Sequence, residues 1–173
     1  THPFRRELWG RYFTFAHNGQ LEGVFSDLPL GRYKPVGTTD SEHIFCWLLH
    51  QLESAFPQGV STMSELYPLV YKCLSLLHDR GVCNVLFTES SALMAYCSNH
   101  LHWITRRAPF GPALLKDIEV SVNFAEETTP NDVVTVIATQ PLTTNEEWTR
   151  LRAGEMVVFE KGELTYQIGG EDV

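Results

Sequence analysis

The chain has 173 residues, of which 43% are hydrophobic, 12% aromatic and 20% charged. This length fits one domain and the apolar share is enough for a core, which excludes disordered, collagen-like and coiled-coil proteins. The 13 basic and 21 acidic residues give a net charge of −8, without the basic character of a nucleic-acid or anionic-membrane binder, and no apolar run is long enough to span a bilayer.

The chain starts at Thr1-His2-Pro3-Phe4, without an initiator Met or a signal peptide. We therefore expect it to be the rear part of something longer. No internal repeat, low-complexity tract or linker divides the sequence, so we expect a single domain over residues 1–173.

The first predicted strand is a short aromatic-rich segment over residues 11–17. An Asn18-Gly19 pair follows it and is typical of a turn, because both residue types tolerate positive φ. A polar loop that contains Gly and Pro is then predicted to residue 37.

Two helices are predicted next. Thr39 and Glu42 have the spacing of a capping box, and apolar residues recur behind them at helical spacing to about residue 56, where Pro57 ends the helix. A second helix is predicted to start near Pro68, a residue favoured in the first turn, and to end at Gly81.

From residue 83 the pattern changes to short apolar runs that are typical of strands. Runs at 83–88 and 92–98 predict a hairpin around residues 89–91, and Lys161-Gly162 predicts the turn of a last hairpin. Further strands are predicted at 102–105, 118–122, 133–138, 156–159 and 164–166. Because short turns favour antiparallel pairing and the helices precede most of the strands, the pattern predicts an α+β fold.

The cysteines form no CxxC pair, which excludes a zinc knuckle and a thioredoxin-type motif. Each lies in an apolar run and is expected to be a buried free thiol, as is typical of a reducing cytoplasm. We expect no metal and no other cofactor, since the helical histidines have no acidic partner at ligand spacing. The cysteines are Cys46, Cys73, Cys83 and Cys97, and the helical histidines are His43, His50 and His78.

Two short motifs have both a structural and a functional interpretation. Asn18-Gly19 is a turn by itself, but an Asn amide beside a Gly N–H is also a pair of neutral donors that can hold a developing oxyanion. Asp40 in the first turn of a helix complements the helix dipole, but it can equally bind a substrate ammonium group. Spacing alone favours the structural interpretation of both motifs.

Taken together, the motifs resemble the class II glutamine amidotransferases. The residues that carry the resemblance are Thr1-His2-Pro3-Phe4, His17-Asn18-Gly19 and Thr39-Asp40-Ser41-Glu42. Later stretches resemble the bacterial stand-alone branch of the family, namely residues 102–110, 136–143, 145–148 and 154–155. The resemblance covers nearly the whole chain, and we therefore prefer the functional interpretation of both motifs.

The resemblance implies a four-layer αββα sandwich with antiparallel sheets, the fold of N-terminal-nucleophile hydrolases, of which this chain would be a partial domain. It implies that Asn18 and Gly19 form the oxyanion hole and that Asp40 binds the α-amino group of glutamine. The family nucleophile is an N-terminal Cys whose α-amine acts as the base, and an upstream Arg binds the substrate α-carboxylate. Neither group is present in residues 1–173, so we expect this chain alone to be inactive.

The remaining polar residues are expected to have structural roles. His2 and His17 are interpreted as hydrogen-bonding groups rather than proton carriers. Arg106 and Arg107 can bind an anionic group of a second substrate or form salt bridges at a strand end, and the latter is preferred. Trp103 and Trp148 are expected to be core or rim aromatics.

The leading hypothesis is glutamine hydrolysis through a γ-glutamyl thioester. One alternative is a hydrolase of another γ-glutamyl amide, and a second is a catalytically silent glutamine-binding module. A role for Thr1 as the nucleophile is disfavoured, because Thr1 aligns with an interior position of the family motif. The implied partners are glutamine or a γ-glutamyl amide and an unidentified ammonia acceptor or synthase, without nucleic acid or membrane, and a homodimer stays open.

Overall fold

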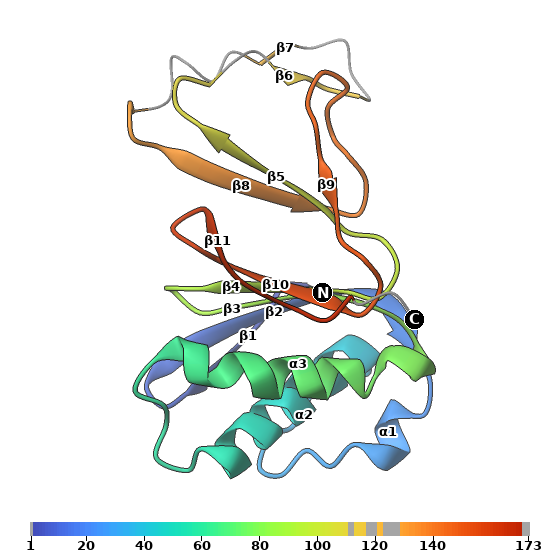
Figure 1. Cartoon of the computed structure of the whole chain (residues 1–173). Helices are drawn as coiled ribbons and strands as arrows, with labels where there is room; N and C mark the ends of the chain where they lie inside the picture. Colours follow the sequence, from blue (N-terminus) through green and yellow to red (C-terminus); the bar gives the residue numbers. More distant parts are fainter. Residues whose placement is uncertain (1, 111–112, 117–120, 123–128, 171–173) are drawn as a thin grey trace.

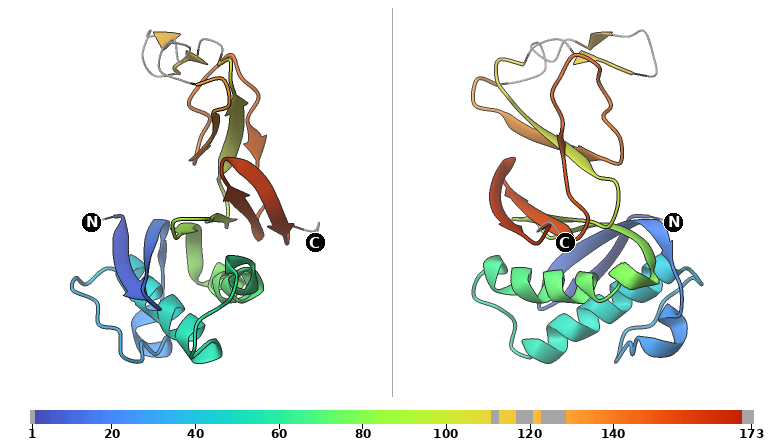
Figure 2. Two further views of the ribbon diagram at one scale, coloured as in Figure 1. Left: turned by 90° about the vertical axis from the view of Figure 1, so that its left-hand side faces the viewer. Right: turned by 45° about the vertical axis from the view of Figure 1, so that its right-hand side comes forward.

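The computed structural model describes residues 2–110, 113–116, 121–122 and 129–170. Its centre is a six-stranded antiparallel sheet in the order β1-β2-β3-β4-β10-β11. One face of this sheet is covered by α2 and α3, and a smaller sheet in the order β8-β5-β9 lies on the other side (Figure 1). Figure 2 shows the same three layers from two further directions.

The strands of the large sheet are β1 (Phe4–Leu8), β2 (Arg11–Leu21), β3 (Gly81–Thr88), β4 (Leu93–Cys97), β10 (Glu155–Glu160) and β11 (Glu163–Ile168). The smaller sheet contains β5 (His102–Arg107), β8 (Val133–Ala138) and β9 (Thr149–Arg150), and β6 (Ala113–Leu114) pairs with β7 (Ser121–Val122). The helices are α1 (Val24–Asp27), α2 (Asp40–Ala55) and α3 (Tyr67–Ser75), with 3-10 turns at η1 (Met63–Leu66) and η2 (His78–Arg80). No helix in this part of the chain is long and apolar enough to cross a membrane.

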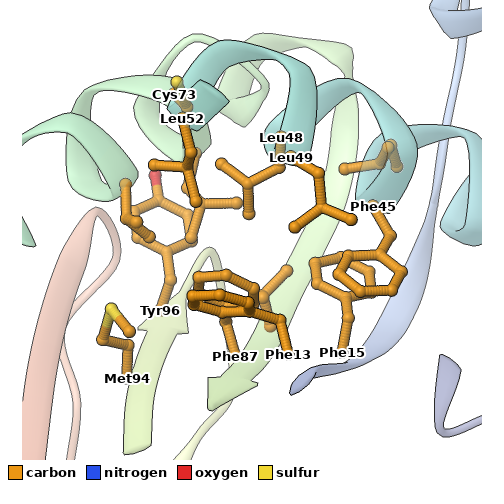
Figure 3. Close-up of a cluster of buried hydrophobic side chains, with 14 of the residues drawn as sticks. Phe13, Phe15, Phe45, Leu48, Leu49, Leu52, Cys73, Phe87, Met94 and Tyr96 are labelled. Carbon is orange, nitrogen blue, oxygen red and sulfur yellow. The ribbon is translucent and has the colours of Figure 1, made fainter. Parts of the chain in front are cut away.

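The main core lies between the helices and the large sheet (Figure 3). Aromatic rings from neighbouring strands form its centre: Phe13 stacks on Phe87 with ring centroids 5.3 Å apart, and Phe15 stacks on Phe45 of α2 at 5.2 Å. Offset ring packing of this kind adds about 0.5–1.5 kcal/mol per pair to the burial of the rings. These contacts hold α2 against β2, and they thereby also fix the position of Asp40 at the N-terminus of α2.

A second, smaller core separates the two sheets. Trp103 of β5 packs edge-on against Phe159 of β10 with ring centroids 5.2 Å apart, and Ile137 of β8 lies against the same cluster. The two faces of β4 and β10 are therefore both covered, which explains why these strands are continuous apolar runs without alternation. The α+β fold with antiparallel sheets, predicted from the sequence, is confirmed.

Most predicted elements are present near their expected positions. The helix predicted to residue 56 is α2, and Pro68 lies in the first turn of α3. The two predicted hairpins are β3–β4 and β10–β11, and the second turns at Lys161 and Gly162, both with positive φ. The predicted strand at 118–122 lies mostly outside the described residues, and α1, β1, β6 and β9 were not predicted. The second helix, predicted to end at Gly81, ends at Ser75, and a separate 3-10 turn, η2, follows it.

Candidate functional site

The end of β2 differs from the prediction. Asn18 and Gly19 do not form a turn; they lie inside a strand that continues to Leu21 and pairs with β3, with Asn18 opposite Asn84 and Gly19 opposite Cys83. Gly19 is required there because β2 and β3 approach closely: a Cβ on Gly19 would lie 1.9 Å from the carbonyl oxygen of Val82. The glycine is therefore needed for strand contact, not for a reverse turn.

We predict that Gly19→Ala lowers the free energy of unfolding by about 3 kcal/mol, the upper end for overpacking, because the obstructing atom belongs to the backbone. Urea denaturation measures the change. Gly10→Ala is the matched control: Gly10 also has positive φ, but a Cβ there would have no neighbour within 4 Å. Its expected cost is about 1 kcal/mol from backbone strain alone. Equal costs for the two variants would contradict the close approach at Gly19.

Alternation along β2 separates the roles of neighbouring residues. His17 is 5% exposed and its side chain contacts Ser41 of α2, so the next side chain, Asn18, points to the opposite face, between the sheets. Backbone groups alternate as well: Glu22 N donates to Arg80 O on the β3 side, whereas Leu21 N donates to Asp40 on the other side. The N–H of Gly19 therefore points to the side on which Asp40 lies.

Asp40, at the start of α2, is anchored by main-chain donors from α2 and from the end of β2. Its Oδ2 accepts from Leu21 N at 2.9 Å, and its Oδ1 accepts from Ser41 N at 2.8 Å. Each carboxylate oxygen has two lone pairs, so the group can still accept from an ammonium ion. Three residues of extended strand separate Leu21 from Asn18, or about 10 Å. Asn18 and the Leu21 N–H that holds Asp40 thus lie at two ends of one short stretch of β2.

β1 reaches only part of this strand. Its pairing with β2 ends at Phe4 opposite Phe15, so in the described strands the β2 edge from residue 16 onward has no ladder partner on that side. His2, which precedes β1, lies near this edge. Burial lowers the pKa of His2, His17 lowers it further, and the Asp40 carboxylate opposes both. The entry to β1, the end of β2 and the start of α2 therefore meet at one place.

His17 joins β2 to both neighbouring elements. Its Nε2 donates to Val82 O at 3.1 Å, so its Nδ1 accepts from the Ser41 hydroxyl at 2.9 Å. Burial lowers the pKa of His17, although the Val82 carbonyl and Asp40 act in the opposite direction. The hydrogen bonds predicted for His17 are therefore present.

This lowered pKa predicts a pH-dependent stability. Unfolded His17 takes up a proton near its ordinary pKa of about 6.5, whereas folded His17 does so only at lower pH. Stability is therefore fully present above this pH and falls as the pH decreases toward the folded pKa, by at most about 1.4 kcal/mol per pH unit. Urea unfolding at pH 7.5 and 5.5 should show a smaller pH difference for His17→Gln than for the parent protein. If the free energy of unfolding changes equally between the two pH values in both proteins, the lowered pKa of His17 is contradicted.

Glu42 does not complete the predicted capping box. The Thr39 side chain accepts from Glu42 N, as expected, but the Glu42 carboxylate instead binds Arg6 of β1 at 2.6 Å. It also accepts from Val36 N at 3.0 Å and Gly37 N at 2.7 Å. Burial would raise the pKa of Glu42, but these donors outweigh it and the pKa lies below its ordinary value. Glu42 thus ties β1 and the incoming loop to α2, beside Asp40.

Asn84 is a buried polar residue that the sequence analysis missed. It is 3% exposed, and its Nδ2 donates to Asn18 O at 3.3 Å and to Asn99 Oδ1 at 2.7 Å. Its Oδ1 accepts from Ser98 N at 3.1 Å and Asn99 N at 3.3 Å. All four hydrogen-bonding positions of the amide are used. The sequence did offer one signal, because Asn84 is a polar residue inside the apolar run 83–88. Its hydrogen-bond partners, however, become known only from the tertiary structure.

Other candidates lie elsewhere. Arg106 pairs with Glu146 and Arg107 with Glu163, which confirms the salt-bridged interpretation of both. A cavity of about 640 Å³ lies between α3 and the end of β11, and Asn18, Gly19 and Asp40 are not among its lining residues. No cluster of metal-ligating side chains occurs in the described ranges. Trp103 is in the core between the sheets, and Trp148 Nε1 donates to Thr143 Oγ1 at 2.9 Å.

A model of the class II glutamine amidotransferases matches residues 1–172 of the chain. The chain is 53% identical over 163 residues to the Escherichia coli K12 protein named "Putative glutamine amidotransferase YafJ", covering 94% of this chain and 64% of that protein. It is 36% identical over 170 residues to a Haemophilus influenzae protein named "Putative glutamine amidotransferase", covering 98% and 57%. The chain therefore spans less than two thirds of the length of these relatives.

Solved structures agree with this assignment. A 2.0 Å crystal structure of a "predicted glutamine amidotransferase" from Pseudomonas aeruginosa PA01 matches with a TM-score of 0.86 and 51% identity, covering 96% of this chain and 64% of that chain. The phosphoribosylpyrophosphate amidotransferase of Bacillus subtilis shares the fold alone, with a TM-score of 0.58 and 13% identity over 95% of this chain and 30% of that chain. The chain belongs to the class II glutamine amidotransferase family and has its N-terminal-nucleophile fold.

Proposed function

We propose that this chain supplies the glutamyl-binding and oxyanion-stabilising part of a glutamine amidohydrolase site. The observation that carries the proposal is the arrangement along β2: Asp40 is fixed at Leu21, and Asn18 lies about 10 Å away along the same strand. That span suits an extended glutamyl group with its ammonium at Asp40 and its γ-carbonyl at Asn18. The Gly19 N–H points to the Asp40 side and acts as the second oxyanion donor.

The nucleophile in this proposal is a cysteine outside residues 1–173. The four cysteines of the chain are all buried and free. Burial raises the pKa of the Cys73 thiol to about 11 and that of Cys83 to about 12, and it also raises the pKa of Cys46 and Cys97. A nucleophilic cysteine needs an accessible thiolate, which these positions disfavour. We propose an N-terminal Cys whose thiolate forms a γ-glutamyl thioester, with its α-amine as the base.

The test is a glutaminase assay of the full gene product, with its N-terminal Cys intact and replaced by Ala. We expect turnover with the Cys and none with the Ala, and no turnover by residues 1–173 alone. Glutamine binding by a folded full-length protein without any hydrolysis would favour the silent binding module instead. Turnover by residues 1–173 at the full-length rate would overturn the proposed nucleophile.

The rest of the proposal concerns context. We propose that residues 1–173 are one amidotransferase domain that lacks its front segment, and that the protein acts in the cytoplasm. The buried free cysteines support a reducing compartment. An ammonia acceptor or synthase partner and a homodimer are compatible with the fold, and the net charge of −8 disfavours nucleic acid as a partner.

A further inference from the structure

A cavity of about 230 Å³ lies between the sheets, on the face of β2 that carries Asn18. Its walls come from three places: the β2–β3 pair, the connection between β4 and β5, and the end of β8. The side chains that matter for a ligand are those of Asn18, Asn99, His100, His102, Thr139 and Gln140. Asn84 supports this wall through its bonds to Asn18 and Asn99.

The described side chains that line the cavity are polar apart from Val82, and none of them carries a fixed charge. In the described part of the chain, amide, imidazole and hydroxyl groups line it, without a carboxylate, Lys or Arg. A glutamyl group has an ammonium and a carboxylate, and both need charged or strongly hydrogen-bonding partners when they leave water. The cavity therefore suits an uncharged part of a substrate better than the glutamyl end.

The cavity is larger than ammonia alone requires. Ammonia is about as large as water, whose share of liquid volume is about 30 Å³. A cavity of about 230 Å³ is several times larger. It can hold an amine with a short substituent.

The direction of the bound substrate places its departing group here. Asp40 lies at the edge of β2 that faces away from β3, whereas the Asn18 side chain lines the cavity between the sheets. With the glutamyl ammonium at Asp40 and the carbonyl at Asn18, the nitrogen beyond the carbonyl faces the cavity. His102 Nδ1 donates to Thr139 O at 3.2 Å, which leaves Nε2 for a ligand.

We propose that this cavity binds the leaving group of a γ-glutamyl amide, an amine that carries a short, uncharged, polar substituent. The inference rests on the proposed function and names its substrate class. In the reaction the nucleophile sulfur bonds to the γ-carbonyl carbon, the C–N bond breaks, and the amine nitrogen takes the thiol proton. Water then adds its oxygen to the acyl carbon, the C–S bond breaks, and glutamate leaves as the thiol regains a proton.

The experiment measures kcat/KM of the full-length protein for L-glutamine, γ-L-glutamylethanolamide and γ-L-glutamylglycine. We expect the ethanolamide to be hydrolysed at least as efficiently as glutamine. Glutamylglycine should be hydrolysed at least tenfold less efficiently than the ethanolamide, because the described lining of the cavity offers no cation to the glycine carboxylate. Gln140→Trp and His100→Trp, which narrow the cavity from two exposed positions, should each lower kcat/KM for the ethanolamide at least tenfold more than for glutamine.

Leu76→Trp is the matched control, since Leu76 is 62% exposed and lies outside the cavity. This variant should leave kcat/KM unchanged for both glutamine and the ethanolamide. Hydrolysis of glutamine without hydrolysis of the ethanolamide would overturn the proposal. Equal losses for both substrates in both narrowing variants would also overturn it. If the folded protein hydrolyses no glutamine, the proposed function itself fails, and the glutamine measurement alone reveals that outcome.

Discussion

Asn18→Ala should lower kcat for glutamine hydrolysis by roughly 10²–10³ while KM changes little. The side-chain amide of Asn18 lies on the face between the sheets, where a γ-carbonyl oxygen would develop negative charge. Its hydrogen bond strengthens as the tetrahedral intermediate forms, so its loss is felt in the transition state and not in the ground state. Steady-state glutaminase kinetics of the full-length protein measure both parameters.

A structural control accompanies this variant. Asn84 holds the Asn18 carbonyl, so an effect of Asn18→Ala on folding would be visible as lost stability rather than as a selective loss of kcat. Circular dichroism and the urea midpoint should match those of the parent protein. A change in KM alone would show that Asn18 does not hold the oxyanion.

Asp40→Asn should mainly raise KM, by roughly 2–4 kcal/mol in substrate binding, because an ammonium then meets a neutral amide in a desolvated place. The charge pair is equally present in the ground state and in the transition state, so kcat should change much less. The measurement is the same kinetic series. A loss of kcat with an unchanged KM would contradict the role of Asp40 in substrate binding.

Asn at position 40 also keeps one acceptor for Leu21 N or Ser41 N, which limits its effect on the fold. Glu53→Gln is a matched control for the removal of a carboxylate: Glu53 pairs with Arg32 on the surface, far along α2 from its N-terminus. It should change neither kinetic parameter, since exposed ion pairs contribute little. An equal rise in KM in both variants would point to a general charge effect.

Local patterns were sufficient for the elements whose cause is local. Apolar spacing and the Thr39 cap determined α2, and Lys161-Gly162 determined the last hairpin, because capping and tight turns depend on a few neighbouring residues. The strand after residue 17 was mispredicted for the same reason. Asn-Gly favours a turn locally, but here the pairing of β2 with β3 from Thr14 to Leu21 is decisive.

The sequence by itself determined the candidate residues Asn18, Gly19 and Asp40, since their motifs are short and specific in combination. Only the tertiary structure decided how they are related. It showed that Leu21 fixes Asp40, that the Glu42 carboxylate binds Arg6 instead of completing the cap, and that Asn84 holds the strand that carries Asn18. These contacts join residues far apart in the chain, and a buried polar group takes whichever partner the packed elements bring to it.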